Sequence, residues 1–378
     1  MRLKTDWPLF LTILFLTSLG LLFVFSASSV IAERRYNEPS YYFFVRQIAW
    51  AVAGFWVLMW LRKWDYRRLN NSERAFTYLG IVIVALMGVQ FADPSFGRWY
   101  RLGPLSFQPS EFAKPVLIIF LAYFASRTGV WINSRHSLIQ ASMAMSVLTA
   151  AVMKADLGTG LVLVVTAAAV FYVAGLDRRY FAVATAVALV AVALAIVSEP
   201  YRLQRLIHYF DEDHSILSKI DPGGAIQPYA HRAEVPPDTG YQARQATVAL
   251  GSGGVLGKGL MQGNQKLGYL PEAHTDFIYA IIGEELGLFG TLLVLAGFLM
   301  ILWRGLRLYW VALDDFGRYL AVGVTVTIVF QALLNMSVAA ALGPTKGIPL
   351  PLISYGGSSL LGTMISLGLL MSVSERTR

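Results

Sequence analysis

The chain has 378 residues, of which 56% are hydrophobic and only 14% are charged, and its mean hydropathy is +0.55. Soluble domains carry about 25% charged residues, so this chain has too few to cover a water-facing surface, and the absence of cysteine excludes disulfides and thiolate metal sites. The net charge of +8 does not indicate nucleic acid, because the basic residues stand in short clusters between apolar runs, as in loops beside a membrane.

The apolar runs predict about ten transmembrane helices, because a helix needs roughly 17–25 residues to cross the hydrocarbon core. They cover residues 7–28, 43–61, 76–91, 110–125, 137–153, 158–175, 180–197, 277–303, 317–341 and 358–373. The third and fourth runs are short, which suggests tilted or partly re-entrant segments. The first is longer than the roughly 7–15 apolar residues of a signal peptide and favours a retained anchor. The sequence therefore predicts an all-α polytopic membrane protein, with residues 1–378 in one membrane domain.

The distribution of lysine and arginine predicts the orientation of this domain. With both termini in the cytoplasm, 16 basic residues fall in the inner loops and termini and 7 in the short outer loops, which agrees with the positive-inside rule. The segment of about 198–275, between the seventh and eighth helices, is then a large extracytoplasmic loop. It is rich in proline, glycine and charge and lacks clear periodicity, and long irregular segments are usually functional or mobile.

Charged side chains at the ends of the predicted spans mark candidate sites, because an ionisable group at mid-bilayer costs about 2.5–3.5 kcal/mol. Glu111 and Lys114 open the fourth span at an i, i+3 spacing that allows them to pair. An alternative is a helix cap, with Ser110 as the capping residue and Glu111 against the positive helix end. Lys114 fits this alternative less well, because a cation opposes the helix dipole there. Asp156, before the sixth span, either belongs to a site or simply caps the next helix.

A denser group of charges leads into the eighth span, with five ionisable side chains within fourteen residues. They are Glu272, His274, Asp276, Glu284 and Glu285. A capped helix with solvated acids does not explain Glu284 and Glu285, which lie about 12–14 Å further along a helix than Asp276. Such charges must face protein or water, so we expect a functional site here. If the chain is extended at Glu272, His274 and Asp276, these alternating side chains could converge on a divalent cation.

The connection before the last span, about residues 343–359, contains three prolines and cannot form a continuous helix. Non-helical backbone at a membrane face is tolerated where it lines a cavity or is packed by protein. Hydroxyls and free amides where the last helix begins form an anion site, which predicts a phosphate-bearing ligand near Lys346. The residues that would build this site with Lys346 are Ser354, Gly356, Gly357 and Ser358. A purely structural turn is the alternative.

Two other motifs are weaker. The stretch Gly251–Gly259 resembles a phosphate-binding loop, but it lacks the hydroxyl residue that follows the lysine in such loops. The acidic run Asp211–Asp213 resembles a metal-binding pair, but on the outer side of the membrane it fits a solvated loop better. Neither motif supports a separate nucleotide site.

The motifs, in this order, resemble the SEDS family (shape, elongation, division and sporulation), whose members polymerise the glycan strands of bacterial peptidoglycan. The resemblance rests on Gly97-Arg98-Trp99, Gln108-Pro109-Ser110-Glu111, Asp156-Leu157-Gly158-Thr159, Leu270–Gly287 and Pro344–Ser359. Residues 199–202, 272–274 and 344–347 are more similar to FtsW, the division branch, than to RodA, the elongation branch. The region of about 216–239 is longer than the usual loop of the family.

The resemblance implies a glycosyltransferase that uses lipid II, a disaccharide-pentapeptide on undecaprenyl pyrophosphate, with inversion at the anomeric carbon. Asp276 matches the essential acid of the family and is assigned the role of general base. The remaining implied substrate-binding residues are the cations Lys346, Lys114 and Arg98 with the amides of Gly356–Ser358 at the pyrophosphate, Glu111 and Asp156 to orient the cations, and Trp99 against sugar or lipid. His274 and Ser354 are further candidates for substrate binding.

The implied partners are a class B penicillin-binding protein with one membrane anchor, other division or elongation proteins, and membrane lipids in the bacterial inner membrane. The resemblance implies no certain cofactor, although a divalent cation is a possibility. The alternative function is a lipid II flippase. A transporter would place its charged site near the midplane, whereas these candidates gather toward the outer face.

Overall fold

The computed structural model describes residues 5–93, 97–102, 105–200, 202–203, 207, 239–344 and 347–377. The described chain is built from α-helices and one short hairpin. The helices are α1 (Trp7–Tyr36), α2 (Tyr42–Lys63), α3 (Ser72–Ala92), α4 (Pro109–Thr128), α5 (Arg135–Ala155), α6 (Leu157–Val173), α7 (Arg178–Val197), α11 (Thr239–Gly253), α12 (Ile278–Val311), α13 (Asp315–Ala339) and α14 (Gly357–Arg376). Strands β1 (Tyr100–Leu102) and β2 (Leu105–Phe107) pair antiparallel, with Arg101 opposite Ser106. Short 3-10 helices cover Tyr66–Leu69, Gly129–Asn133 and Gln265–Leu267.

Each of the ten predicted spans corresponds to one of these helices, which confirms the all-α polytopic fold. Within the described ranges, eight helices are long and apolar enough to cross a membrane by length and composition. Two further helices correspond to predicted spans: α4, which contains charged residues, and α6, which has only 17 residues. The expectation of short third and fourth spans is wrong, because α3 has 21 residues and α4 has 20. Both helices are longer than their apolar runs because their end turns contain polar residues.

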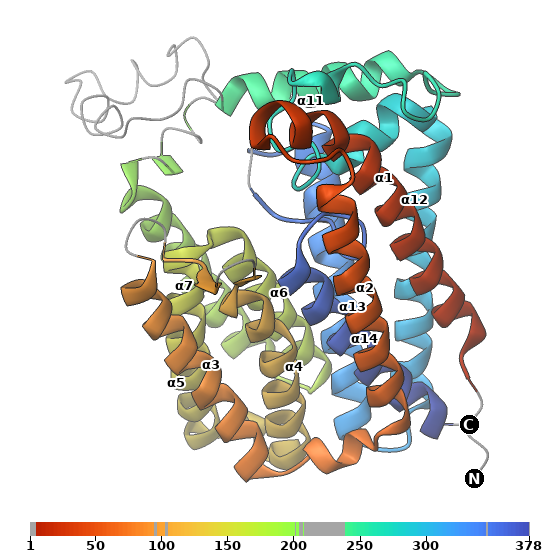
Figure 1. Ribbon diagram of the computed structural model, residues 1–378. Coiled ribbons are helices and arrows are strands. Elements are labelled where there is room, and N and C mark those ends of the chain that lie inside the picture. Colours follow the sequence, from red (N-terminus) through yellow and green to blue (C-terminus); the bar gives the residue numbers. More distant parts are fainter. Residues whose placement is uncertain are drawn as a thin grey trace, which may run out of the picture.

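The long helices stand side by side and alternate in direction, with both ends of the described chain at one end of the bundle (Figure 1). Helix α11 lies across the opposite end, which we call the α11 face. Helices α4, α6, α12 and α14 all begin at the α11 face because each follows a helix or segment that reaches it.

The centre of the bundle is formed by α13 and α14. In their most apolar stretches, 72% of α13 and 83% of α14 is buried inside the described protein. Helix α13 packs against α4, α6, α12 and α14, so it lies between the two hydrophobic clusters of the core. By contrast, α7 buries none of its residues against the rest of the described chain.

The predicted outer loop of about 198–275 is not wholly irregular, because α11 lies within it. The sequence lacks a clear apolar stripe here because α11 is short and packs mainly on α12, with a smaller contact to α13. The contact is close: a Cβ atom on Gly253 would lie 1.9 Å from Gly283 O. The acidic run at 211–213 and nearly all of the region of about 216–239 lie outside the described residues.

Candidate active site

Asp276 lies at the α11 face, in a segment whose backbone is held at three successive positions. The carbonyl oxygens of His274, Thr275 and Asp276 accept hydrogen bonds from Tyr355 N (3.0 Å), Ser354 Oγ (2.5 Å) and Asn335 Nδ2 (2.7 Å), respectively. Since each carbonyl is fixed from outside its own segment, the Asp276 backbone has little freedom to move.

The carboxylate of Asp276 is half-buried beside Gly347, at whose position a Cβ atom would approach Asp276 Oδ2 to 2.9 Å. The proline-containing segment 347–356 is non-helical, as predicted, and protein packs around it. Its Ser354 accepts a hydrogen bond from Leu350 N at 2.8 Å and so ties the turn together. The hydroxyl of Ser354 thus links this turn to the carbonyl of Thr275, the residue before Asp276.

A line of polar contacts runs from this segment to the predicted pair on α4. Glu111 and Lys114 form an ion pair of 2.6 Å, and both are buried. Lys114 Nζ also donates to Gln331 Oε1 at 2.8 Å, and Gln331 Nε2 donates to Pro349 O at 2.8 Å. The pairing hypothesis is therefore confirmed by the geometry. The capping alternative with Ser110 is wrong, because α4 is capped at Gln108 and makes no side-chain capping bond.

Asp156 is the N-cap of α6, as one of the two sequence hypotheses stated. Its Oδ1 accepts from Gly158 N at 2.9 Å and from Thr159 N at 3.3 Å. The cap nevertheless adjoins the candidate site, because Gly158 lies against the side chain of Ile348, only 2.5 Å from where a Cβ atom would stand.

The start of α14 lies against α2 and the segment before α4. Gly356 N donates to Gln47 Oε1 at 3.2 Å, and Gly357 packs on the indole of Trp50. The buried Ser358 hydroxyl accepts from Gln108 N at 3.1 Å and contacts Ser106 O at 3.3 Å. Among the described helices, α4, α6, α12 and α14 thus begin around the segment 347–356. The N-termini of α4 and α6 carry Glu111 and Asp156, so the positive dipole ends that favour a bound anion are those of α12 and α14.

His274 is 6% exposed and packs among aromatic rings, with centroid distances of 5.0 Å to Phe43 and 5.6 Å to Tyr355. Burial lowers the pKa of His274, Glu272 acts in the opposite direction, and the positive charge of Arg35 lowers it further. The imidazole is therefore neutral near pH 7 and supports the Asp276 segment as an aromatic side chain.

Two other predicted residues lie at the end of α3. The half-buried residues Arg98 and Trp99 direct their backbone N–H groups toward Asp93 Oδ2, at 3.3 and 3.4 Å. They precede the β1–β2 hairpin, which leads into α4. Lys346 lies outside the described residues.

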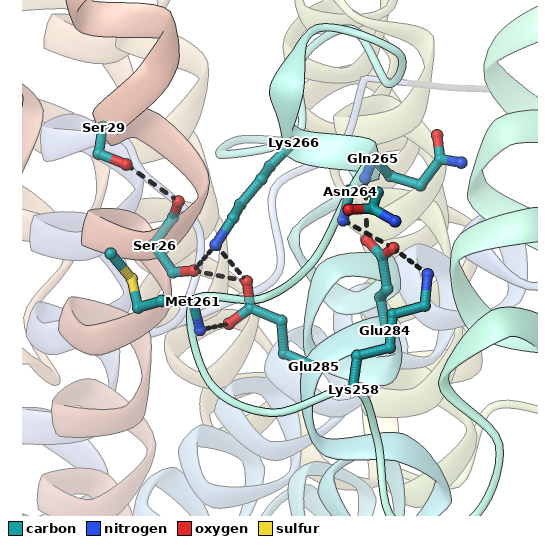
Figure 2. A network of polar contacts seen from close by, with 9 residues as sticks. All are labelled: Ser26, Ser29, Lys258, Met261, Asn264, Gln265, Lys266, Glu284 and Glu285. Atoms are coloured by element: carbon teal, nitrogen blue, oxygen red, sulfur yellow. Dashed lines mark hydrogen bonds and ion pairs between the residues drawn. The ribbon is translucent and has the colours of Figure 1, made fainter.

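Glu284 and Glu285 are fully buried, and Figure 2 shows how their charges are matched. Glu284 pairs with Lys258 and Glu285 with Lys266, each at 2.7 Å, and Ser26 of α1 donates to Glu285 at 2.6 Å. Backbone amides of Met261, Asn264 and Gln265 donate to the same carboxylates. The sequence required both acids to face protein or water, and the structure shows that both face protein. Their contacts fold the segment 254–267 onto α12.

The glycine-rich stretch Gly251–Gly259, which resembles a phosphate loop, packs on a kink in α12. At Gly287 the backbone has φ 66° and ψ −157°, a conformation suited to glycine, and a Cβ atom there would lie 2.4 Å from Gly257 N. The kink exposes backbone groups that the stretch satisfies: Leu288 N donates to Gly254 O, and Lys258 N donates to Glu284 O. The glycines therefore serve close backbone contact.

The described residues contain no group of three histidine, aspartate or glutamate side chains arranged to hold a metal ion. Glu272, His274 and Asp276 make no such group: Glu272 is exposed with φ 54°, while His274 points into the aromatic cluster. The extended conformation that would bring the three together does not form.

Sequence reasoning missed Gln47, Gln331 and Asn335, the buried amides that hold the site together. All three lie inside apolar helices, and Gln331 and Asn335 are spaced i, i+4 on one face of α13. That spacing of amides in an apolar span was the available signal. Amides are less conspicuous than charged groups in an apolar span, because they carry no charge.

The chain matches the family model described as "Cell cycle protein", named for FtsW, RodA and SpoVE, over residues 6–378. It is 36% identical over 381 residues to the "Probable peptidoglycan glycosyltransferase FtsW" of Geobacter sulfurreducens, covering 99% of this chain and 96% of the relative. It is 35% identical to "Stage V sporulation protein E" of Bacillus subtilis, covering 99% of each chain.

Solved structures agree with these sequence comparisons. RodA of Thermus thermophilus has a TM-score of 0.69 and 25% identity, covering 100% of this chain and 98% of that one. A chain in a structure described as "Structural coordination of polymerization and crosslinking by a peptidoglycan synthase complex" has a TM-score of 0.74, 25% identity and coverage of 100% and 99%. The charged motifs, the ten-helix arrangement and the full-length matches together place this chain in the FtsW, RodA and SpoVE family, the SEDS proteins.

Proposed function

We propose that this chain is a peptidoglycan glycosyltransferase that polymerises glycan strands from lipid II at the outer face of the bacterial inner membrane. The observation that carries the proposal is the fixed position of Asp276 at the α11 face, where four described helices begin. Asp276 can act on one part of a bound substrate while the helix N-termini attract its negatively charged part. The relatives named peptidoglycan glycosyltransferase support the same activity.

The proposed reaction joins two sugars with inversion. The 4-hydroxyl of the acceptor attacks the anomeric carbon of the donor, the bond from that carbon to the pyrophosphate oxygen breaks, and undecaprenyl pyrophosphate leaves. Asp276 takes the hydroxyl proton as general base. Lys114, Arg98, Lys346 and the amides at the start of α14 stabilise the negative leaving group, while Glu111 holds Lys114 in place. Trp99 lines the path of the sugar or the lipid.

The proposed orientation of the protein in the membrane follows from the distribution of its basic residues. The connections at the end opposite α11 contain most of the basic residues, which supports a cytoplasmic position for both termini and an extracytoplasmic position for Asp276. The proposed partner is a class B penicillin-binding protein that cross-links the nascent strand, in line with the polymerisation and crosslinking complex among the structural neighbours. The relatives named FtsW favour a role in division.

The test is polymerisation of purified lipid II in detergent, with and without the partner. Wild type is expected to form glycan polymer, and Asp276→Asn, which is isosteric but cannot accept the proton, is expected to lose at least 10²-fold in rate. Because the lipid is already accessible, the assay requires no transport. Polymer formation by Asp276→Asn at the wild-type rate would remove the base assignment, and no polymer from wild type with its partner would remove the enzymatic proposal.

We further propose that any divalent cation needed by the reaction is held by the substrate pyrophosphate, because the described residues offer no three-ligand cage. Chelation should then slow turnover without lowering the melting temperature of the free protein. A chelator that lowers this temperature would indicate a site in the protein instead.

A further inference from the structure

Asn335 of α13 contacts both segments that meet at the candidate active site. Its Nδ2 donates to Asp276 O and to Ile348 O, each at 2.7 Å, and the side chain is 2% exposed. The two N–H groups of one amide are therefore both used, one on the segment that leads into α12 and one on the segment that leads into α14.

The orientation of this amide is set by its surroundings. A flipped amide would place Oδ1 against two carbonyl oxygens, which is repulsive. In the observed orientation Oδ1 is buried and has no hydrogen-bond partner among the described residues. An unsatisfied buried acceptor costs about 1–3 kcal/mol. The two hydrogen bonds that Asn335 donates therefore form even though they leave its own oxygen without a partner.

Other buried polar residues of α13 behave differently. Thr325 and Thr327 donate to carbonyls of their own helix, at Ala321 and Gly323, and Thr327 also contacts the Thr166 hydroxyl of the regular helix α6. Asn335 reaches out of α13 to two irregular segments, and Gln331, one turn earlier, does the same to Pro349 O while it accepts from Lys114. One face of α13 thus links the Asp276 segment to the buried cation of α4.

We propose that Asn335 is a positioning residue that sets where the Asp276 carboxylate lies relative to the segment at Gly347. The inference rests on the proposed function, in which Asp276 acts as the base. The bond to Asp276 O fixes the backbone from which the carboxylate extends. The bond to Ile348 O fixes the opposite wall, where Gly347 lies against Asp276 Oδ2. A change at Asn335 therefore alters the chemical step more than substrate binding.

The test compares Asn335→Asp, Asn335→Ser and the control Thr327→Val in the lipid II assay. Asn335→Asp keeps the shape but replaces both donors with acceptors and adds a negative charge near Asp276. We expect kcat to fall by about 10²-fold with KM for lipid II within about threefold of wild type. The acid limb of its pH–rate profile should move to higher pH, because a nearby negative charge favours protonated Asp276.

The matched control is Thr327→Val. Thr327 lies on α13, as Asn335 does, and the change removes its buried hydrogen bond to Thr166 of α6. It should lower the melting temperature and leave kcat and the pH profile unchanged. If Asn335→Asp does not fold, Asn335→Ser replaces it in the test. Serine is smaller and cannot donate to both carbonyls, so kcat should again fall while KM changes little. Wild-type kcat and pH profile in a folded Asn335 variant would overturn the positioning role. Retained activity of Asp276→Asn would instead remove the base assignment, and no polymer from wild type would remove the proposed function, so these failures are distinguishable.

Discussion

At the scale of single residues, the site is organised by buried side chains that hold backbone. Asn335 fixes Asp276 O, and Gln47 donates to Ser354 O and accepts from Gly356 N. Sequence patterns predicted the charged members, because charge in an apolar run is conspicuous. They could not predict which carbonyls the amides would meet, because those contacts join segments far apart in the chain.

His274 makes the stability of the protein depend on pH. Its pKa is lowered in the folded state, chiefly by burial, so the unfolded state binds the proton more readily. Stability is therefore fully present above the unfolded pKa of about 6.5 and falls as pH decreases below it. We expect a lower melting temperature at pH 5 than at pH 7.5 in detergent, and a smaller difference for His274→Phe. An equal pH dependence in that variant would contradict the assignment.

At the scale of elements, the segment 254–267 is held on α12 by matched buried charges. The sequence predicted that Glu284 and Glu285 must face protein or water, and the pairing with Lys258 and Lys266 satisfies that requirement. Their structural role was not predictable, because the lysines lie in a glycine-rich stretch without periodicity. The kink at Gly287 brings these partners together.

Removing one member of a buried pair leaves an uncompensated charge, which costs about 3–5 kcal/mol, whereas removing both costs far less. We expect Glu285→Gln and Lys266→Met each to lower the melting temperature strongly. The double variant should recover part of the loss.

The control is Asp315→Asn, which breaks the exposed i, i+3 pair with Arg318 and should change the melting temperature little. Additive losses in the double variant, measured by thermal unfolding in detergent, would show that Glu285 and Lys266 do not interact.

At the scale of the whole molecule, hydropathy predicted ten helices and their order, because each span is long and apolar. It did not indicate which helices lie at the centre. Helix α7 is as apolar as the others yet has no fully buried residue within the described chain, whereas α13 is largely enclosed. Packing order depends on small residues and polar contacts between helices, which a hydropathy pattern does not contain.

The two ends of the described chain are joined at the end opposite α11. The buried Asp6 accepts from Arg304 of α12 and from Ser374 of α14. We expect Asp6→Asn to lower the melting temperature, because Arg304 is 3% exposed and would lose its counter-charge. Polymerisation by the surviving folded fraction should keep the wild-type KM. A change in KM would show that this contact also shapes the distant site.

The positions of the buried charges along the chain bear on how the protein is made. Lys258 and Lys266 are synthesised before Glu284 and Glu285, so both counter-ions of α12 have emerged when that helix enters the bilayer. Asp6 is translated 298 residues before Arg304 of α12 and 368 residues before Ser374 of α14. The contact that joins the start of α1 to both helices therefore forms only after α14 has been made, and a chain that stalls before α14 lacks it.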